Sequence, residues 1–163
     1  MESEVSELRN ALYRGDRVTA DALVADGVLL NVFDVAALGD ADLLGEYLAA
    51  DASLAQAWSA DGFSALHFAA YLGGGDSVRV LLKAGADVAA VARNAMLVQP
   101  LHSAVALGDL RACRELLDAG ADPNAEQQGG FRPLDEAVIT RNDDVATLLR
   151  ERGAQLSGNP LAQ

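Results

Sequence analysis

Apolar residues recur three and four positions apart in several short stretches of the chain. They are Val78, Leu81 and Leu82 in one stretch and Leu110, Cys113, Leu116 and Leu117 in another. This spacing puts the apolar side chains on one face of a helix. Gly85 and Gly120 follow these stretches, where a left-handed residue commonly ends a helix. The pattern therefore predicts short amphipathic helices, each followed by a turn.

A shorter apolar segment precedes each of these helices. One example, LHFAAYL at residues 66–72, is rich in small residues and ends at Gly73. Such segments open with Pro or a hydroxyl residue, which favour the first turn of a helix. A Gly, often followed by Asp, separates the two segments. We therefore expect pairs of closely packed helices.

The helix pairs form an internal repeat. Leu66, Leu101 and Leu134 hold the same place in successive copies and are 35 and 33 residues apart, while two weaker copies lie upstream. Each copy spans 12 residues from its first glycine position to its second. Constant internal length with variable joints is typical of stacked helical units. The sequence predicts one all-α domain over 1–163, with a disordered tail at 157–163 and five units at about 5–28, 29–58, 59–92, 93–126 and 127–156.

Two segments, DGFSALHFAA…LLKAGADV from Asp61 and QPLHSAV…ELLDAGADPNA from Gln99, carry a specific signature. They resemble the ankyrin repeat, which combines Asp-Gly, Thr-Pro-Leu-His, Ala-Ala, Gly, paired leucines and Gly-Ala-Asp. The resemblance is highly specific over 61–127, good over 129–155 and only structural over 8–59. It implies an ankyrin-type helical solenoid, with projecting β-turns between the later repeats and a concave face built from turns and first helices. The chain departs from the signature at Ser64-Ala65, Gln99-Pro100 and Arg132-Pro133, which replace Thr-Pro, and at Asp135, which replaces His.

Composition and charge narrow the function classes. The formal net charge of -12 argues against nucleic-acid binding, because a phosphate backbone requires basic side chains. It favours solubility and a partner with a basic surface. The start, MESEVSELRN, lacks the features of a signal peptide, and no apolar run is long enough to cross a membrane. Since a single cysteine cannot form an internal disulfide, we expect a cytoplasmic protein without membrane contact.

The two histidines, His67 and His102, lie in matching positions of successive units. The resemblance implies that each holds its turn by hydrogen bonds to backbone groups. The repeat supports this role, because the same position holds Phe33, Arg9 or Asp135 in other units. A catalytic pair would need a positioned nucleophile or acid, and zinc would need about four N or S ligands. We expect no catalytic residue, no metal and no cofactor.

Other features have a structural and a functional interpretation. Cys113 lies where other units hold Ala20, Leu44, Val78 and Ala146, which favours a small buried hydrophobe over a reactive thiol. The glycine run at 72–77 lacks the Lys-Ser/Thr of a phosphate loop, which favours a turn over a nucleotide site. The Asp-rich segments GDAD and NDDV lack calcium-loop spacing and are predicted helix caps. The joint at 91–100 is two residues longer than a regular one, and it either adds partner contacts or is a tolerated variation.

The resemblance also assigns a partner-binding surface. Two residues before the first glycine of each unit face the concave groove, and the turn tips add further side chains. The set is apolar for an exposed surface, which favours a partner site, although Leu72, Leu107 and Ile139 could instead pack between units. The groove residues are Tyr13, Arg14, Leu38, Tyr71, Leu72, Leu107, Ile139 and Thr140, and the turn residues are Asp61, Phe63, Met96, Val98, Gln128 and Phe131.

These observations together predict a non-catalytic protein–protein interaction module. It would be a small adaptor or regulatory subunit that binds a partner through its groove and turn tips. Self-association or small-ligand binding through the same apolar groove are the alternatives, and we expect a monomer. Polar Asp143 and Arg150 on the last unit fit a stack that ends there.

Overall fold

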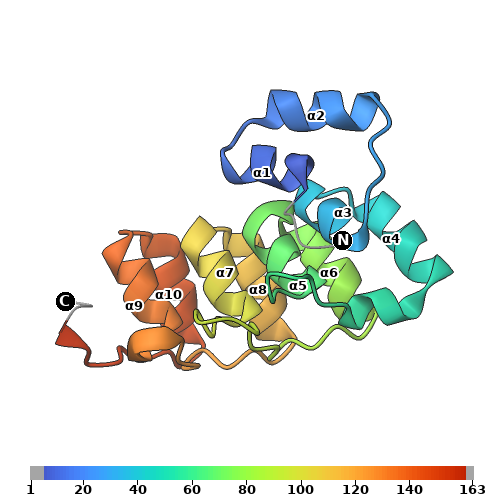
Figure 1. Cartoon of the computed structure of the whole chain (residues 1–163). Coiled ribbons are helices and arrows are strands. Elements are labelled where there is room, and N and C mark those ends of the chain that lie inside the picture. Colours follow the sequence, from blue (N-terminus) through green and yellow to red (C-terminus); the bar gives the residue numbers. More distant parts are fainter. Residues whose placement is uncertain (1–5, 161–163) are drawn as a thin grey trace.

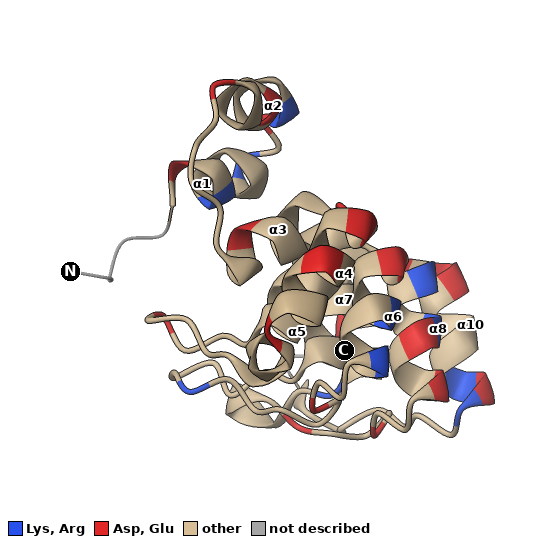
Figure 2. Ribbon diagram, turned by 90° about the vertical axis from the view of Figure 1, so that its right-hand side faces the viewer, with Lys and Arg blue, Asp and Glu red and all other residues tan. Residues whose placement is uncertain are grey.

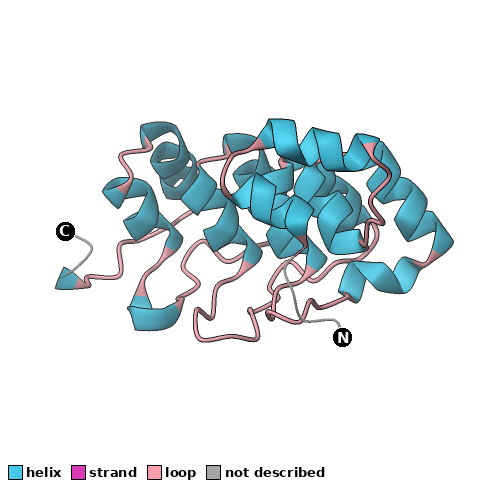
Figure 3. Ribbon diagram, turned by 45° about the horizontal axis from the view of Figure 1, so that its top comes forward, coloured by secondary structure: helices cyan, strands magenta, loops and turns pink. Residues whose placement is uncertain are grey.

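The structure is a computed structural model that describes residues 6–160, and the described residues form an all-α solenoid without strands (Figures 1 and 3). Its helices are α1 (Glu7–Tyr13), α2 (Arg17–Ala25), α3 (Val32–Leu38), α4 (Ala41–Ala50), α5 (Ala65–Phe68), α6 (Gly75–Lys83), α7 (Pro100–Leu107), α8 (Leu110–Asp118), α9 (Pro133–Ile139) and α10 (Asp143–Glu151). A π-helical turn, η2 (Ala69–Gly73), continues α5, and two 3-10 turns are η1 (Ala52–Gln56) and η3 (Gln128–Gly130). Each predicted unit contains one helix pair.

Within residues 6–160, none of the helices combines the length and the apolar character needed to cross a bilayer.

Short polar side chains begin the second helix of most pairs. Asp16, Asp40, Asp109 and Asn142 each accept a hydrogen bond from a backbone N–H in the first turn of the helix that follows. These bonds satisfy N–H groups that have no partner inside a helix. The Asp-rich segments are therefore helix caps.

The glycine run at residues 73–75 is a place of close backbone approach between two units. A Cβ on Gly73 would lie 1.9 Å from the carbonyl oxygen of Ala36 in α3, far inside van der Waals contact. Gly74 has φ 82° and ψ 175°, a conformation found almost only in glycine. The run forms the turn between η2 and α6 and lets the α3–α4 pair pack against it.

The main core runs through the pairs from α3 to α10. Its largest fully buried residues include leucines that recur with the repeat, namely Leu44, Leu66, Leu81, Leu101, Leu116 and Leu149. Small residues such as Ala36, Ala69 and Ala104 separate them and are also fully buried. Alanine lets successive helices approach closely, which explains a core with few aromatic residues.

The first pair is attached differently. Its small core of Leu8, Ala11 and Ala20 forms a separate cluster. Helix α1 packs on α3, but α2 makes no contact with α4 comparable to that of α4 with α6. Figures 1 and 2 show α2 standing away from the row of second helices. The stack is therefore tight from α3 onward and open at its N-terminal pair.

The chain after α10 differs from the predicted disordered tail. The backbone N–H of Ser157 donates to Asp135 at 3.0 Å, and the side-chain amide of Asn159 donates to the carbonyl oxygen of Gly129 at 2.8 Å. These bonds hold residues 157–160 against the last turn. Residues 161–163 of the predicted tail lie outside the described residues.

Candidate protein-binding groove

His67 bonds backbone groups of two successive turns. The N–H of Ser64 donates to Nδ1 of His67 at 3.2 Å, and Nε2 lies 3.0 Å from the carbonyl oxygen of Val98. Because an N–H only donates and a carbonyl only accepts, the imidazole is neutral and carries its proton on Nε2. Burial lowers the pKa of His67 to about 4, although the bond to Val98 acts in the opposite direction.

His102 repeats this arrangement one unit later. Its Nδ1 accepts the N–H of Gln99 at 3.0 Å, and its Nε2 lies 3.0 Å from the carbonyl oxygen of Ala125. Burial again lowers the pKa. Each ring therefore ties the start of its own helix to the next projecting turn, and both ring nitrogens are occupied.

Carboxylates hold the same position in the second and fifth units, and in the fifth the following segment presents an N–H instead of a carbonyl. Asp135 accepts the N–H of Arg132 at 2.8 Å and that of Ser157 at 3.0 Å. In the second unit the residue is Asp34, which accepts the N–H of its N-cap residue at 3.1 Å, so the assignment of Phe33 to this position is wrong. The first helix of that unit is one residue shorter, and counting back from its glycine misplaces the position by one.

A buried ion pair joins the first two units. Nε of Arg9 donates to Oδ1 of Asp34 at 2.9 Å, and the two residues are only 5% and 1% exposed. The hydroxyl of Ser6 donates to the same carboxylate. The Arg9 guanidinium also lies over the ring of Phe68, 5.0 Å from its centre. These contacts hold α1 against α3 and α5.

A groove of about 530 Å³ opens along the first helices and the projecting turns. The residues that line it come from α1, α5, η2, α7 and α9 and from the turns before α5, α7 and α9. They are Tyr13, Asp61, Phe63, His67, Phe68, Tyr71, Met96, Val98, His102, Ser103, Ala106, Gln127 and Glu136. The groove thus draws on the first, third, fourth and fifth units.

Aromatic rings form much of the groove. The rings of Tyr13 and Tyr71 lie 5.9 Å apart, and those of Phe63 and Phe68 are also 5.9 Å apart in an edge-to-face arrangement. The position that holds Tyr13 in the first unit and Tyr71 in the third holds the fully buried Ala37 in the second. The second unit therefore places no ring between the two tyrosines. Burial, together with the negative charge of Asp61, raises the pKa of Tyr13 to about 12.

The structure brings together only part of the predicted surface. Tyr13, Asp61, Phe63, Tyr71, Met96 and Val98 line the groove, whereas Arg14, Leu72, Leu107, Gln128, Phe131, Ile139 and Thr140 do not. Val98 contributes little surface, because it is buried and its carbonyl bonds His67. Leu107 and Ile139 are each 49% exposed on first helices beyond the lining. Part of the predicted surface therefore forms one compact site, and the other predicted residues lie outside it.

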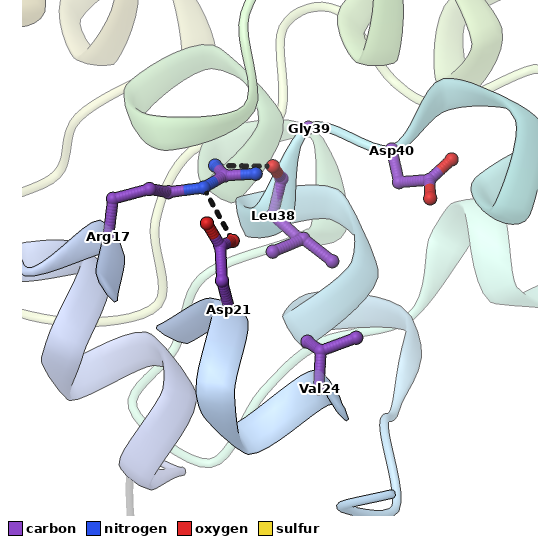
Figure 4. A pocket seen from close by; sticks show the side chains of 6 residues that line it. All are labelled: Arg17, Asp21, Val24, Leu38, Gly39 and Asp40. Carbon is purple, nitrogen blue, oxygen red and sulfur yellow. Dashed lines mark hydrogen bonds and ion pairs between the residues drawn. The ribbon is translucent and has the colours of Figure 1, made fainter. Parts of the chain in front are cut away.

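The prediction that Leu38 faces the groove is wrong. It is buried and lines a different cavity, of about 380 Å³, between α2 and the turn from α3 to α4. Figure 4 shows Arg17 beside this cavity, with its guanidinium bonded to Asp21 at 2.9 Å and to the carbonyl oxygen of Leu38 at 3.0 Å. The splayed first unit occupies the space that Leu38 was expected to face.

Sequence reasoning missed Phe68, Ser103, Gln127 and Glu136 among the lining residues. Ser103 lies three and four residues before Ala106 and Leu107, and Glu136 has the same spacing to Ile139 and Thr140. Residues with that spacing share one face of a helix. Extending the predicted face back by one turn would have found both.

The Cys113 thiol and the possible metal-binding side chains bear on whether the described residues could carry out catalysis. Cys113 is fully buried in α8, and burial raises its pKa to about 12, so the reactive thiolate is scarce at neutral pH. Among residues 6–160, no three His, Cys, Asp or Glu side chains gather where they could hold a metal ion. The groove itself offers aromatic and aliphatic surface beside two carboxylates, which is suited to contact with another molecule.

A family model described as ankyrin repeats in three copies matches residues 30–127. The chain belongs to the ankyrin repeat family. The predicted ankyrin-type fold is thereby confirmed, and ankyrin repeats generally mediate protein–protein interactions. A search of curated proteins found no match. The matched ankyrin repeats include the groove residues Phe63, Tyr71 and Met96, whereas Tyr13 and Glu136 lie outside the match.

Proposed function

We propose that this ankyrin repeat chain is a non-catalytic adaptor or regulatory subunit that binds a partner protein in the groove. One observation carries the proposal: exposed aromatic and aliphatic side chains from separate units converge there. Tyr13, Tyr71 and Met96 are 42%, 37% and 52% exposed and belong to three different units. Aromatic residues and Met are enriched at interfaces, and they often supply most of the binding energy.

The groove is also preorganised for binding. His67 and His102 hold its turns through buried hydrogen bonds, and the Arg9–Asp34 pair fixes α1, which carries Tyr13. Binding to a surface that is already ordered costs less conformational entropy. This supports recognition by a rigid surface without a chemical step.

The partner is expected to present a basic surface, because the chain has a net charge of -12. We further propose that the chain works as a monomer in the cytoplasm. Light scattering over a range of concentrations should then give a constant mass equal to one chain. A mass that rises with concentration and returns to one chain in Tyr71→Ala would favour self-association through the groove.

Affinity capture from lysate tests the proposed function. Wild type is compared with Tyr71→Ala, Met96→Ala and the control Leu156→Ala, which removes a side chain 49% exposed outside the groove. Proteins retained by wild type and the control, and lost by both folded groove variants, support the groove as the site. Identical retention by all four chains contradicts it.

A further inference from the structure

The charged side chains that line the groove have one sign. Apart from the neutral histidines, they are Asp61, in the turn before α5, and Glu136, on α9. Neither forms an ion pair with any described residue. The hydroxyl of Ser59 donates to Asp61 but does not compensate its charge. The groove therefore keeps a negative potential at two places contributed by different units.

Some acidic residues elsewhere on the stack form ion pairs, unlike Asp61 and Glu136. On the second-helix face, Asp76 of α6 pairs with both Arg79 and Arg111, and Arg152 pairs with Asp118. Figure 2 shows basic positions along this face, around α6, α8 and α10. Arg79, Arg111 and Arg152 are thus engaged with carboxylates outside the groove.

The turn at residues 92–98, which hydrogen bonds hold to both neighbouring turns, forms one wall of the groove. Its two sides are joined by the N–H of Ala92, which donates to the carbonyl oxygen of Val98 at 2.8 Å. The N–H of Arg93 donates to the carbonyl oxygen of Gly62 in the preceding turn at 2.8 Å. The backbone carbonyl oxygen of Met96 accepts the N–H of Gln128 in the following turn at 3.0 Å. The longer joint is therefore fixed by both neighbours.

Leu97 at the tip of this turn has φ 53°, a conformation that a bulky residue rarely adopts. Such a conformation persists when the surrounding structure determines it, and it is found preferentially at binding sites. The turn thereby presents Met96 to the groove as a fixed contact rather than as part of a loose loop.

We infer that the groove takes a short partner segment in which an apolar side chain is flanked by lysine or arginine. The apolar side chain packs against Tyr13, Tyr71 and Met96, and the flanking cations meet Asp61 and Glu136. The faces of the two tyrosines add a further attraction for a cation. An acidic or phosphorylated segment is disfavoured by like-charge repulsion. The inference rests on the proposed function and names the chemistry of its partner.

A displayed library of random dodecapeptides tests the inference with the full chain as bait. Peptides enriched by wild type should share an apolar residue with Lys or Arg on both sides. The strongest is then labelled and its affinity measured by fluorescence anisotropy at low and high salt. Asp61→Asn and Glu136→Gln should each weaken binding about two- to fivefold and reduce its salt dependence.

One matched charge variant and two groove variants separate the possible explanations. Glu46→Gln makes the same charge change on the exposed surface of α4, outside the groove, and should leave affinity unchanged. Equal weakening by Glu46→Gln and Glu136→Gln would show a general charge effect and overturn the inference. Tyr71→Ala and Met96→Ala, checked for folding by circular dichroism, report whether a peptide occupies the groove.

The outcomes distinguish the inference from the proposed function. Enriched peptides that lack basic residues but are lost on Tyr71→Ala overturn the inference and leave groove binding intact. An absence of enriched peptides, or peptides that bind both groove variants as well as wild type, overturns both.

Discussion

Asp34, His67, His102 and Asp135 are buried polar side chains that bond backbone groups, and Asp34 also bonds the buried guanidinium of Arg9. Each accepts the N–H at the start of its own helix, and each bonds a neighbouring unit or segment with its other polar atom. A buried backbone group left without a partner costs about 1–3 kcal/mol. In each of these four units a single residue therefore fixes both the helix start and a connection to a neighbouring unit or segment.

Acidification from about pH 6.5 to about pH 4 should lower the free energy of unfolding. The pKa of His67 falls from 6.5 to about 4 on folding, and that of His102 also falls, because burial disfavours the charged ring. Above pH 6.5 both rings are neutral in either state and their stabilisation is fully present. Below it the unfolded chain binds protons first, so stability falls by up to about 1.4 kcal/mol per pH unit for each histidine.

Urea unfolding between neutral pH and pH 4 measures this dependence. Asp16 and Asp51 have pKa values lowered by side-chain hydrogen bonds from Thr19 and Ser53, so their contribution is lost only below their usual value of 3.8. His67→Gln should remove part of the slope. An unchanged slope in that variant would refute the assignment to His67.

Removing one partner of the Arg9–Asp34 pair should lower the free energy of unfolding more than replacing both residues with apolar ones. Asp34→Ala leaves a buried guanidinium without its partner, so we expect a loss of about 3–5 kcal/mol. In the double variant Arg9→Met/Asp34→Leu most of that loss should disappear, because no buried charge remains. Urea unfolding of the three chains provides the comparison, and a double variant as unstable as Asp34→Ala would contradict it.

At the scale of the elements, glycine has two different uses in this chain. Gly73 lies where η2 meets the carbonyl oxygen of Ala36, and a side chain there has no room. Gly45 lies inside α4 with nothing within 4 Å of the position of its Cβ. The first glycine is required by the packing of two units, and the second is not.

Alanine substitutions at these two positions should have opposite effects. Gly73→Ala should lower the free energy of unfolding by at least about 2 kcal/mol, because the backbone of α3 must move away. Gly45→Ala should raise it by about 0.5–1 kcal/mol, since alanine loses less backbone entropy in a helix. Thermal and urea unfolding of both variants measure the difference. Similar effects at both positions would contradict the close approach seen at Gly73.

At the scale of the whole molecule, the stack is less uniform than its repeat suggests. The pairs from α3 to α10 share one core, whereas α1 and α2 have a small core of their own and a cavity between α2 and the next turn. In a stacked repeat, stability depends on each interface between neighbours. The first unit has the weakest such interface, although it supplies Tyr13 to the groove.

Hydrogen exchange should therefore reveal an early opening of the first unit. Amides of α1 and α2 are expected to exchange faster than those of α6 and α8, which are packed on both sides. Mass spectrometry of peptides from each helix pair measures the order. Equal protection of α2 and α8 would show that the open N-terminal pair is as stable as the central stack.

The sequence by itself determined the helix pairs, their five-fold repetition and their family, because helical periodicity, caps and glycine spacing act over a few residues. It also located Tyr13, Phe63, Tyr71 and Met96 of the groove. Only the tertiary structure decided which positions meet. Leu38 left the predicted surface because α2 lies beside it, and residues from units distant in sequence, such as Tyr13 and Glu136, line one groove. The angles between stacked units depend on contacts such as Gly73 with Ala36 and Arg9 with Asp34, which no local pattern specifies.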